Sequence, residues 1–136
     1  MDLSELMTAE AHEEGAEVNI NSPVTGKASD VFIKVLGPDS KAYRMETKRH
    51  MSKVVAEYRK LKDDSRSLDF ELMSEQEIEG EIKKLVVVTV GWRGICDKGE
   101  EVPFSKEMCE KLYRSAPHVV IQVSNFLADY TNFTKG

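Results

Sequence analysis

The chain has 136 residues, of which 40% are hydrophobic and 32% are charged, and its formal net charge is −5. This length fits one domain, the acidic balance disfavours non-specific binding to nucleic acid, and no apolar run reaches the roughly 18 to 20 residues that a membrane-spanning helix needs. No Lys or Arg precedes Lys27 and no apolar stretch lies before it, so the composition predicts no secretory signal and we expect a cytoplasmic protein.

Residues 1–15 form an acidic N-terminal segment. Leu3, Leu6 and Met7 share one possible helical face, so the segment is either a short helix that docks on the rest of the chain or a mobile terminus. The remainder, residues 16–133, is predicted to form a single domain.

Residues 17–20 and 31–36 are β-branched and alternate in polarity, which predicts two strands. The turn-rich segment 21–26 between them predicts a hairpin with a long loop. Because an isolated hairpin is marginally stable in water, this one must pack on helices or pair with another chain.

Asp39 or Ser40 is expected to cap a long helix that follows the turn at Gly37 and Pro38. Its inner stripe recurs at steps of three and four, whereas its other face is strongly basic. The predicted stripe consists of Tyr43, Thr47, Met51, Val54, Val55, Tyr58 and Leu61.

The charge reverses in residues 63–81, which are mostly acidic. We favour partial neutralisation across an antiparallel helix pair; attraction of phosphate or an acidic partner by the basic helix is the alternative. Ser74 and Glu77 have the spacing of a capping box and predict the start of a second long helix there. The apolar run 86–90 could be a buried strand, but it continues the helical stripe without a break, so we interpret it as the buried end of this helix.

Gly91 and Gly94 flank Trp92, the single tryptophan, which predicts a tight bend that buries the indole between the long helix and the C-terminal helices. Pro103, Phe104 and Ser105 then begin the next helix, with Ser105 as its N-cap. The expected inner face of that helix is Met108, Cys109, Leu112 and Tyr113.

Pro117 is expected to start the last helix, whose apolar residues include Val119, Val120, Val123, Phe126, Leu127 and Tyr130. The pattern as a whole predicts an α+β fold, mainly α, in which a small N-terminal β-hairpin packs on a bundle of about four helices.

The sequence contains little that predicts catalysis or cofactor binding. Cys96 and Cys109 are expected to be free thiols, although their separation would permit a disulfide, and the three histidines have no metal-ligand spacing. The segment 91–94 lacks the length and the lysine of a phosphate-binding loop. We therefore expect no enzyme activity, no catalytic residues, no metal and no cofactor.

Four segments, in this order and spacing, resemble the tail assembly chaperones of long-tailed bacteriophages and related prophages: Ser22-Pro23-Val24-Thr25-Gly26, Val35-Leu36-Gly37-Pro38-Asp39-Ser40-Lys41-Ala42-Tyr43-Arg44, Val90-Gly91-Trp92-Arg93-Gly94-Ile95 and Val102-Pro103-Phe104-Ser105. The C-terminal residues Leu112, Tyr113, Pro117, Gln122, Val123, Phe126, Asp129, Asn132 and Phe133 add to the resemblance, which covers nearly the whole chain.

The resemblance implies a protein that acts in the host cytoplasm and is absent from the mature virion. It would coat the helical tape measure protein and keep it soluble until major tail (tube) subunits displace it. It also implies a longer form of the same protein made by ribosomal frameshifting, and homo-oligomerisation is a further possibility.

The candidate partner contacts are Tyr113, Phe126, Tyr130 and Phe133, because the C-terminal helices carry more aromatics than a thin core readily hides. The alternative for these four is that all belong to the core. A structural tail completion or head-tail joining protein of the virion is the rival function, and a small nucleic-acid-binding regulator is the third.

Overall fold

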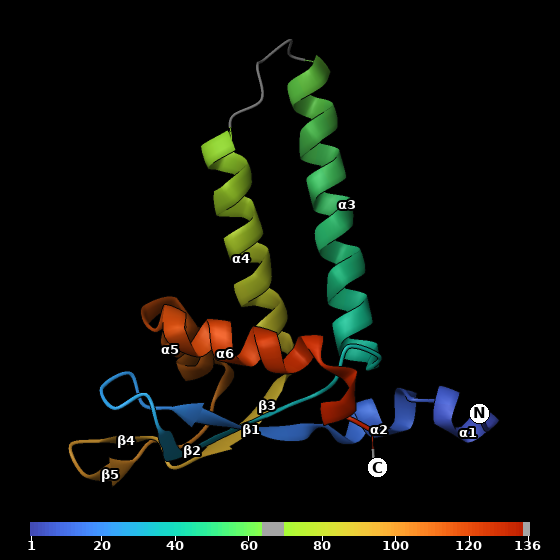
Figure 1. Cartoon of the computed structure of the whole chain (residues 1–136). Helices are drawn as coiled ribbons and strands as arrows, with labels where there is room; N and C mark the ends of the chain where they lie inside the picture. The colour runs from blue at the N-terminus through green and yellow to red at the C-terminus, as the bar shows by residue number, and fades with distance from the viewer. Residues whose placement is uncertain (64–69, 135–136) are drawn as a thin grey trace.

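A computed structural model of the protein describes residues 1–63 and 70–134 (Figure 1). In chain order the elements are α1 (Leu3–Leu6), α2 (Ala9–Glu14), β1 (Ala16–Asn21), β2 (Ala28–Val35), α3 (Lys41–Asp63), α4 (Phe70–Val88), β3 (Thr89–Arg93), β4 (Cys96–Asp97), β5 (Glu100–Glu101), α5 (Lys106–Ser115), α6 (Pro117–Ala128) and a 3-10 turn, η1 (Tyr130–Asn132). The predicted fold class, α+β and mainly α with an N-terminal hairpin, is confirmed.

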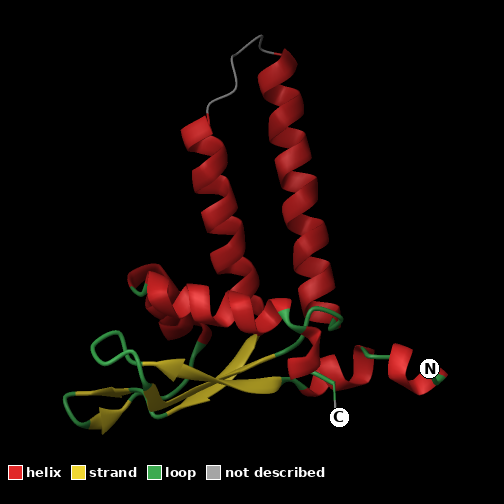
Figure 2. Ribbon diagram, in the orientation of Figure 1, coloured by secondary structure: helices red, strands yellow, loops and turns green. Residues whose placement is uncertain are grey.

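The main helices form two groups, one long projecting pair and one pair of shorter helices that packs on the sheet (Figure 2). The long helices α3 and α4 form an antiparallel pair that stands away from the body, whereas α5 and α6 lie across the base of α4 and cover the sheet (Figure 1). The core therefore lies between the sheet, the helices α5 and α6, and the C-terminal end of α4. Its buried hydrophobic side chains are Val18, Ile20, Ile33, Val35, Ile82, Leu85, Val88, Cys109, Tyr113, Val119, Val123, Leu127 and Phe133.

The main sheet has the order β1-β2-β3, and both pairings are antiparallel. The hairpin register places Val18 opposite Ile33, so alternate side chains of both strands enter the core. The predicted hairpin is thus confirmed, and its second strand pairs with β3 from the same chain. A separate two-stranded ribbon, β4–β5, occupies the segment just after Trp92.

The interpretation of residues 86–90 as the end of a helix is wrong in its last two residues, because α4 ends at Val88 and Thr89 begins β3. Carbonyl groups at this junction find partners outside the helix: the Lys106 ammonium donates to Val86 O, Val87 O and Thr89 O, at 2.7, 3.1 and 2.6 Å. The Leu36 N–H donates to Val88 O at 2.8 Å. These distant donors satisfy the last carbonyls of α4 and allow the chain to leave the helix as a strand.

The start of α4 also differs from the expectation. The helix begins at Phe70, so Ser74 lies inside it and the predicted capping box at Ser74 and Glu77 is wrong. The N-cap of α5 is confirmed, because the Ser105 hydroxyl accepts the Met108 N–H at 3.1 Å. Pro117 begins α6 as predicted.

The predicted inner faces of two helices need correction. On α3, Tyr43 and Val54 are half-buried, but Thr47, Met51 and Val55 are exposed. The physical reason is that α3 has only α4 beside it over most of its length, so a narrow face suffices; the side chains of Tyr58 and Leu61 lie outside the described ones. On α5, Cys109 and Tyr113 are buried as expected, whereas Met108 is exposed.

Both cysteines are free thiols, with Cys96 exposed and Cys109 buried. None of the helices among the described residues is both long enough and apolar enough to span a bilayer.

Candidate functional site

The tryptophan motif, residues 91–94, connects the sheet to the segment that precedes α5. Trp92 lies in β3 opposite Ile33, so the predicted tight bend at this residue is wrong. Its side chain packs against the core as expected, but it is half-buried rather than largely buried. Its indole N–H donates to Val102 O at 2.8 Å, and its ring meets Phe104 edge to face at 5.1 Å. These contacts fasten the segment before α5 to the sheet. Gly91 continues the strand, Gly94 ends it with φ +86°, and Pro103 is exposed.

The four aromatic residues predicted to bind a partner do not form one surface. Tyr113 and Phe133 are buried, at 1% and 3% exposure, so in this conformation they lie in the core, as the alternative for these residues had it. Phe126 is half-buried and packs edge to face on Phe133 at 5.5 Å. Tyr130 is 47% exposed and lies in η1, beyond the last helix.

Tyr130 and Phe133 are held by a junction that the sequence did not reveal, centred on the fully buried His12 of α2. The imidazole contacts both aromatic rings, with centroid distances of 4.9 Å to Tyr130 and 5.1 Å to Phe133. Its Nδ1 accepts the Asp39 N–H at 2.8 Å, and the Asp39 carboxylate accepts hydrogen bonds from the Tyr130 hydroxyl and the Thr8 hydroxyl. The junction therefore docks α2 and η1 on the start of α3, so the N-terminal segment is anchored from Thr8 onward.

The junction has a defined protonation state. Because Nδ1 accepts a hydrogen bond, the neutral ring carries its proton on Nε2, which lies 3.9 Å from the Asp39 carboxylate and has no hydrogen-bond partner. Burial lowers the pKa of the His12 imidazole below its ordinary value of 6.5, and the charge of Asp39 offsets this only in part. A second proton would have to enter at Nδ1 and would break the bond to the Asp39 N–H.

We expect the free energy of unfolding to fall as the pH drops from about 7.5 to 5.5, because the unfolded chain protonates His12 more readily than the native one. The stabilisation is complete above the ordinary pKa and is lost as the pH falls through it toward the lower native pKa. Urea unfolding at several pH values measures the slope. His12→Asn keeps an acceptor for the Asp39 N–H and should flatten the slope. An unchanged slope in His12→Asn would contradict the assignment.

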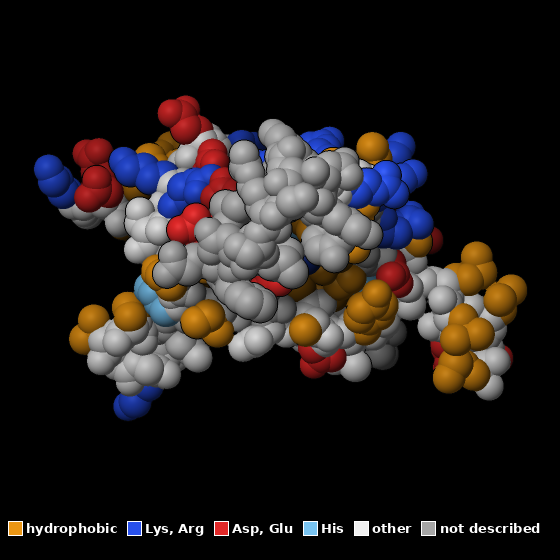
Figure 3. All heavy atoms as spheres, turned by 90° about the horizontal axis from the view of Figure 1, so that it is seen from above, with side chains coloured by type: hydrophobic (Ala, Val, Ile, Leu, Met, Phe, Trp, Pro, Cys, Tyr) orange, Lys and Arg blue, Asp and Glu red, His pale blue; other side chains and the backbone are white. Residues whose placement is uncertain are grey.

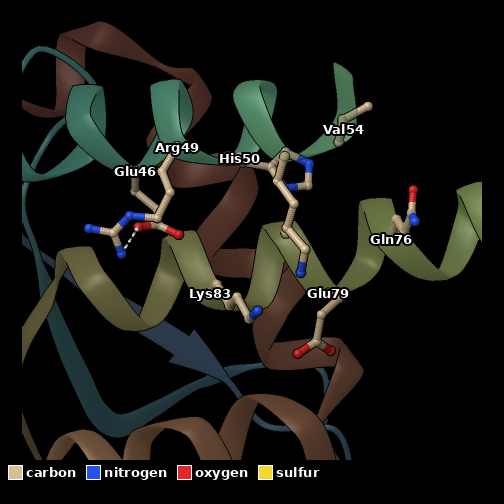
Figure 4. Close-up of a pocket in the computed structure, with 9 residues that line it drawn as sticks. Glu46, Arg49, His50, Val54, Gln76, Glu79 and Lys83 are labelled. Atoms are coloured by element: carbon tan, nitrogen blue, oxygen red, sulfur yellow. Dashed lines mark ion pairs between the residues drawn. The ribbon is translucent and has the colours of Figure 1, made fainter. Parts of the chain in front are cut away.

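The α3–α4 interface contains a small pocket of about 90 Å³ (Figure 4). His50 of α3 projects toward α4, where Gly80 leaves room for its ring: a Cβ at position 80 would lie 2.2 Å from His50 Cε1. Glu46 and Arg49 lie at one end of the pocket and form an ion pair at 3.2 Å. The pocket is small and its lining carries both positive and negative side chains, so its chemistry does not select a ligand. The residues that line it pack α3 against α4.

The predicted antiparallel pairing of the basic and acidic helices is confirmed. The side chains of residues 61–74, which include half of the acidic residues of segment 63–81, lie outside the described ones. Among the described side chains of α3 and α4, the ion pairs run along each helix or from Glu79 to Arg114 of α5, at 2.6 Å. The hydrogen bond from Arg114 lowers the pKa of Glu79, and the charges of Lys83 and Lys53 lower it further. The described basic side chains on the other face of α3 are exposed: Lys41, Arg44, Lys48, Arg49, Lys53 and Arg59.

That face carries the best candidate interaction surface, which we name the outer stripe: Arg44, Lys48, Met51, Val55 and Arg59 of α3. These residues follow one another at steps of four, three, four and four, so they share one face of the helix. All five are exposed, with Met51 at 57% and Val55 at 41%. Lys and Arg side chains gather over α3 when the molecule is seen from above (Figure 3).

The sequence contains a signal for this surface, although the spacing of Met51 and Val55 predicts that they belong to the core. Met51 and Val55 fit an inner stripe by spacing alone, but Lys48 lies three residues before Met51 and Arg59 lies four residues after Val55. Arg44, four residues before Lys48, extends the same row. An apolar pair inside a cationic row is typical of a helix face that faces water or a partner rather than a core.

No group of three or more His, Cys, Asp or Glu side chains among the described residues is arranged to hold a metal ion. Comparison of the chain with protein-family models, with curated proteins and with solved structures gave no match.

Proposed function

We propose that the protein is a tail assembly chaperone of a long-tailed phage or prophage, which binds the tape measure protein in the host cytoplasm and keeps it soluble. The observation that supports this proposal best is the outer stripe on a long helix that stands clear of the body. The family resemblance of the sequence is independent of this observation. Major tail (tube) subunits would displace the chaperone as they polymerise.

The chemistry of the stripe suits an amphipathic helical client. At about 1.5 Å per residue, the 23 residues of α3 extend for about 35 Å, long enough to lie along several turns of another helix. Methionine adapts to different apolar partners, so Met51 would accept the varied side chains of a long client. The surrounding Arg44, Lys48 and Arg59 would contact acidic side chains at the margin, where weak ion pairs allow displacement.

The test is co-expression with the tape measure protein of the same phage genome. Wild-type chaperone should raise the soluble fraction of the tape measure protein. Met51→Ser with Val55→Ser should remove most of this gain, because full burial of a Met or Val side chain contributes about 1.5 to 3 kcal/mol. Val24→Ser is the matched control: Val24 is 90% exposed in the β1–β2 loop, far from the stripe in the chain, and its loss should change nothing.

Two results would contradict the proposal. One is the absence of any gain in soluble tape measure protein with the wild-type chain. The other is the presence of this protein at a fixed copy number in purified particles, which would favour a structural tail completion or head-tail joining protein instead.

A further inference from the structure

The N-terminal end of the chain is an apolar arm without a described neighbour to cover it. We name residues Met1–Met7 the arm; it contains α1 and lies beyond the anchored α2. Its four large hydrophobic side chains, Met1, Leu3, Leu6 and Met7, are 94%, 71%, 63% and 68% exposed. Figure 3 shows hydrophobic side chains gathered at the right edge of the molecule, the side on which α1 lies in Figure 1. Four large apolar side chains so close together and so exposed are unusual for a surface that stays in water.

The anchoring of α2 sets the direction of the arm. The Thr8 hydroxyl bonds to the Asp39 carboxylate, and the Glu13 carboxylate accepts the Lys41 N–H. With both ends of α2 fixed to the start of α3, α1 extends away from the body (Figure 1). Only the base of the arm lies near α3, where Leu6 and Met7 line an open hollow together with Asp39 and Arg44. The arm is therefore presented to another molecule.

The charge of the N-terminal segment indicates what that molecule is. Residues 1–14 carry five carboxylates and no Lys or Arg, and two of these carboxylates, Asp2 and Glu5, lie in the arm itself. The outer stripe has the opposite charge and a matching apolar centre, Met51 and Val55. An acidic arm with exposed leucines thus complements a basic helix face with an exposed methionine and valine on the same chain.

We propose that the arm of one copy docks on the outer stripe of a second copy, so that Leu3 and Leu6 cover Met51 and Val55. Asp2 and Glu5 then lie near Lys48 and the two arginines of the stripe. The arm is short, so the contact is weak, with a dissociation constant on the order of ten micromolar or more. This contact does not depend on the proposed function, although a client helix on the same stripe would compete with it.

Sedimentation velocity of the full chain over a range of concentrations tests the proposal. Wild-type protein should change from monomer to dimer or larger species as its concentration rises to several hundred micromolar, and added salt should weaken the association. Leu3→Ser with Leu6→Ser should weaken the association at least about tenfold, and so should Met51→Ser with Val55→Ser. Val24→Ser, which removes an equally exposed side chain elsewhere, should leave it unchanged.

Mixing the two double variants gives the sharpest result. Each variant lacks one half of the contact, but the mixture contains an intact arm and an intact stripe on different chains, so association should reappear only in the mixture. The proposal is overturned if wild-type protein stays monomeric throughout, if the arm variant associates like wild type, or if the mixture remains monomeric. Client solubilisation without self-association would leave the proposed function standing and remove only this contact.

Discussion

Tyr113→Ala is expected to lower the free energy of unfolding by about 3 to 5 kcal/mol, the range for removal of a large buried aromatic ring. Tyr113 is 1% exposed, and its hydroxyl lies 2.7 Å from the Thr89 hydroxyl, which in turn donates to Leu85 O at 2.6 Å. The substitution removes the ring from the centre of the core and leaves this hydrogen-bond chain incomplete at the junction of α4 and β3. Urea unfolding monitored by circular dichroism measures the effect.

Tyr113→Phe separates the contribution of the hydroxyl group from that of the ring, and Ile121→Ala is the surface control. Tyr113→Phe keeps the ring and should cost only about 1 to 2 kcal/mol, for the lost hydrogen bond. Ile121→Ala changes a 60% exposed residue of α6 and should cost no more than about 0.5 kcal/mol. If Tyr113→Ala retained wild-type stability but lost client solubilisation, Tyr113 would return to the partner surface.

Gly94→Ala is expected to cost about 3 to 5 kcal/mol, because two penalties coincide at this residue. Its φ of +86° lies in the left-handed region, where a side chain is strained. In addition, an added Cβ would lie 2.0 Å from Asp30 O, a backbone atom that cannot rotate aside. Relief would require β3 to move away from β2 beside the pair formed by Phe32 and Arg93.

Gly99→Ala is the matched control, because Gly99 has nearly the same φ, +83°, but nothing within 4 Å of the added Cβ. This variant isolates the backbone strain and should cost about 1 to 2 kcal/mol. The difference between the two variants in urea unfolding then measures the steric conflict with β2. Equal costs would show that the close approach of Gly94 to Asp30 has no energetic consequence.

Local signals in the sequence were sufficient where the deciding interactions are also local. The β1–β2 hairpin follows from alternation on both sides of a turn-rich loop, and the Ser105 cap follows from a hydroxyl next to the first N–H groups of α5. Pro117 begins α6 because its fixed φ suits the first turn of a helix. The cap and the helix start need only residues within a few positions along the chain, and the hairpin needs only two segments joined by one loop.

The candidate site was less predictable. Of the four aromatic residues expected from the sequence to contact a partner, Tyr113 and Phe133 are in the core. Conversely, Met51 and Val55 were expected in the core but are exposed. Spacing identifies which residues share a helix face, but it does not determine whether another element covers that face.

The sequence by itself determined the fold class, the first two strands and the four main helices. The tertiary structure decided that the run after Val88 becomes a strand, because the partners of its backbone are Lys106 and β2, distant in the chain. It also decided which apolar residues face water, because α3 and α4 stand clear of the body. Burial depends on the placement of whole elements, and no local pattern of residues contains that information.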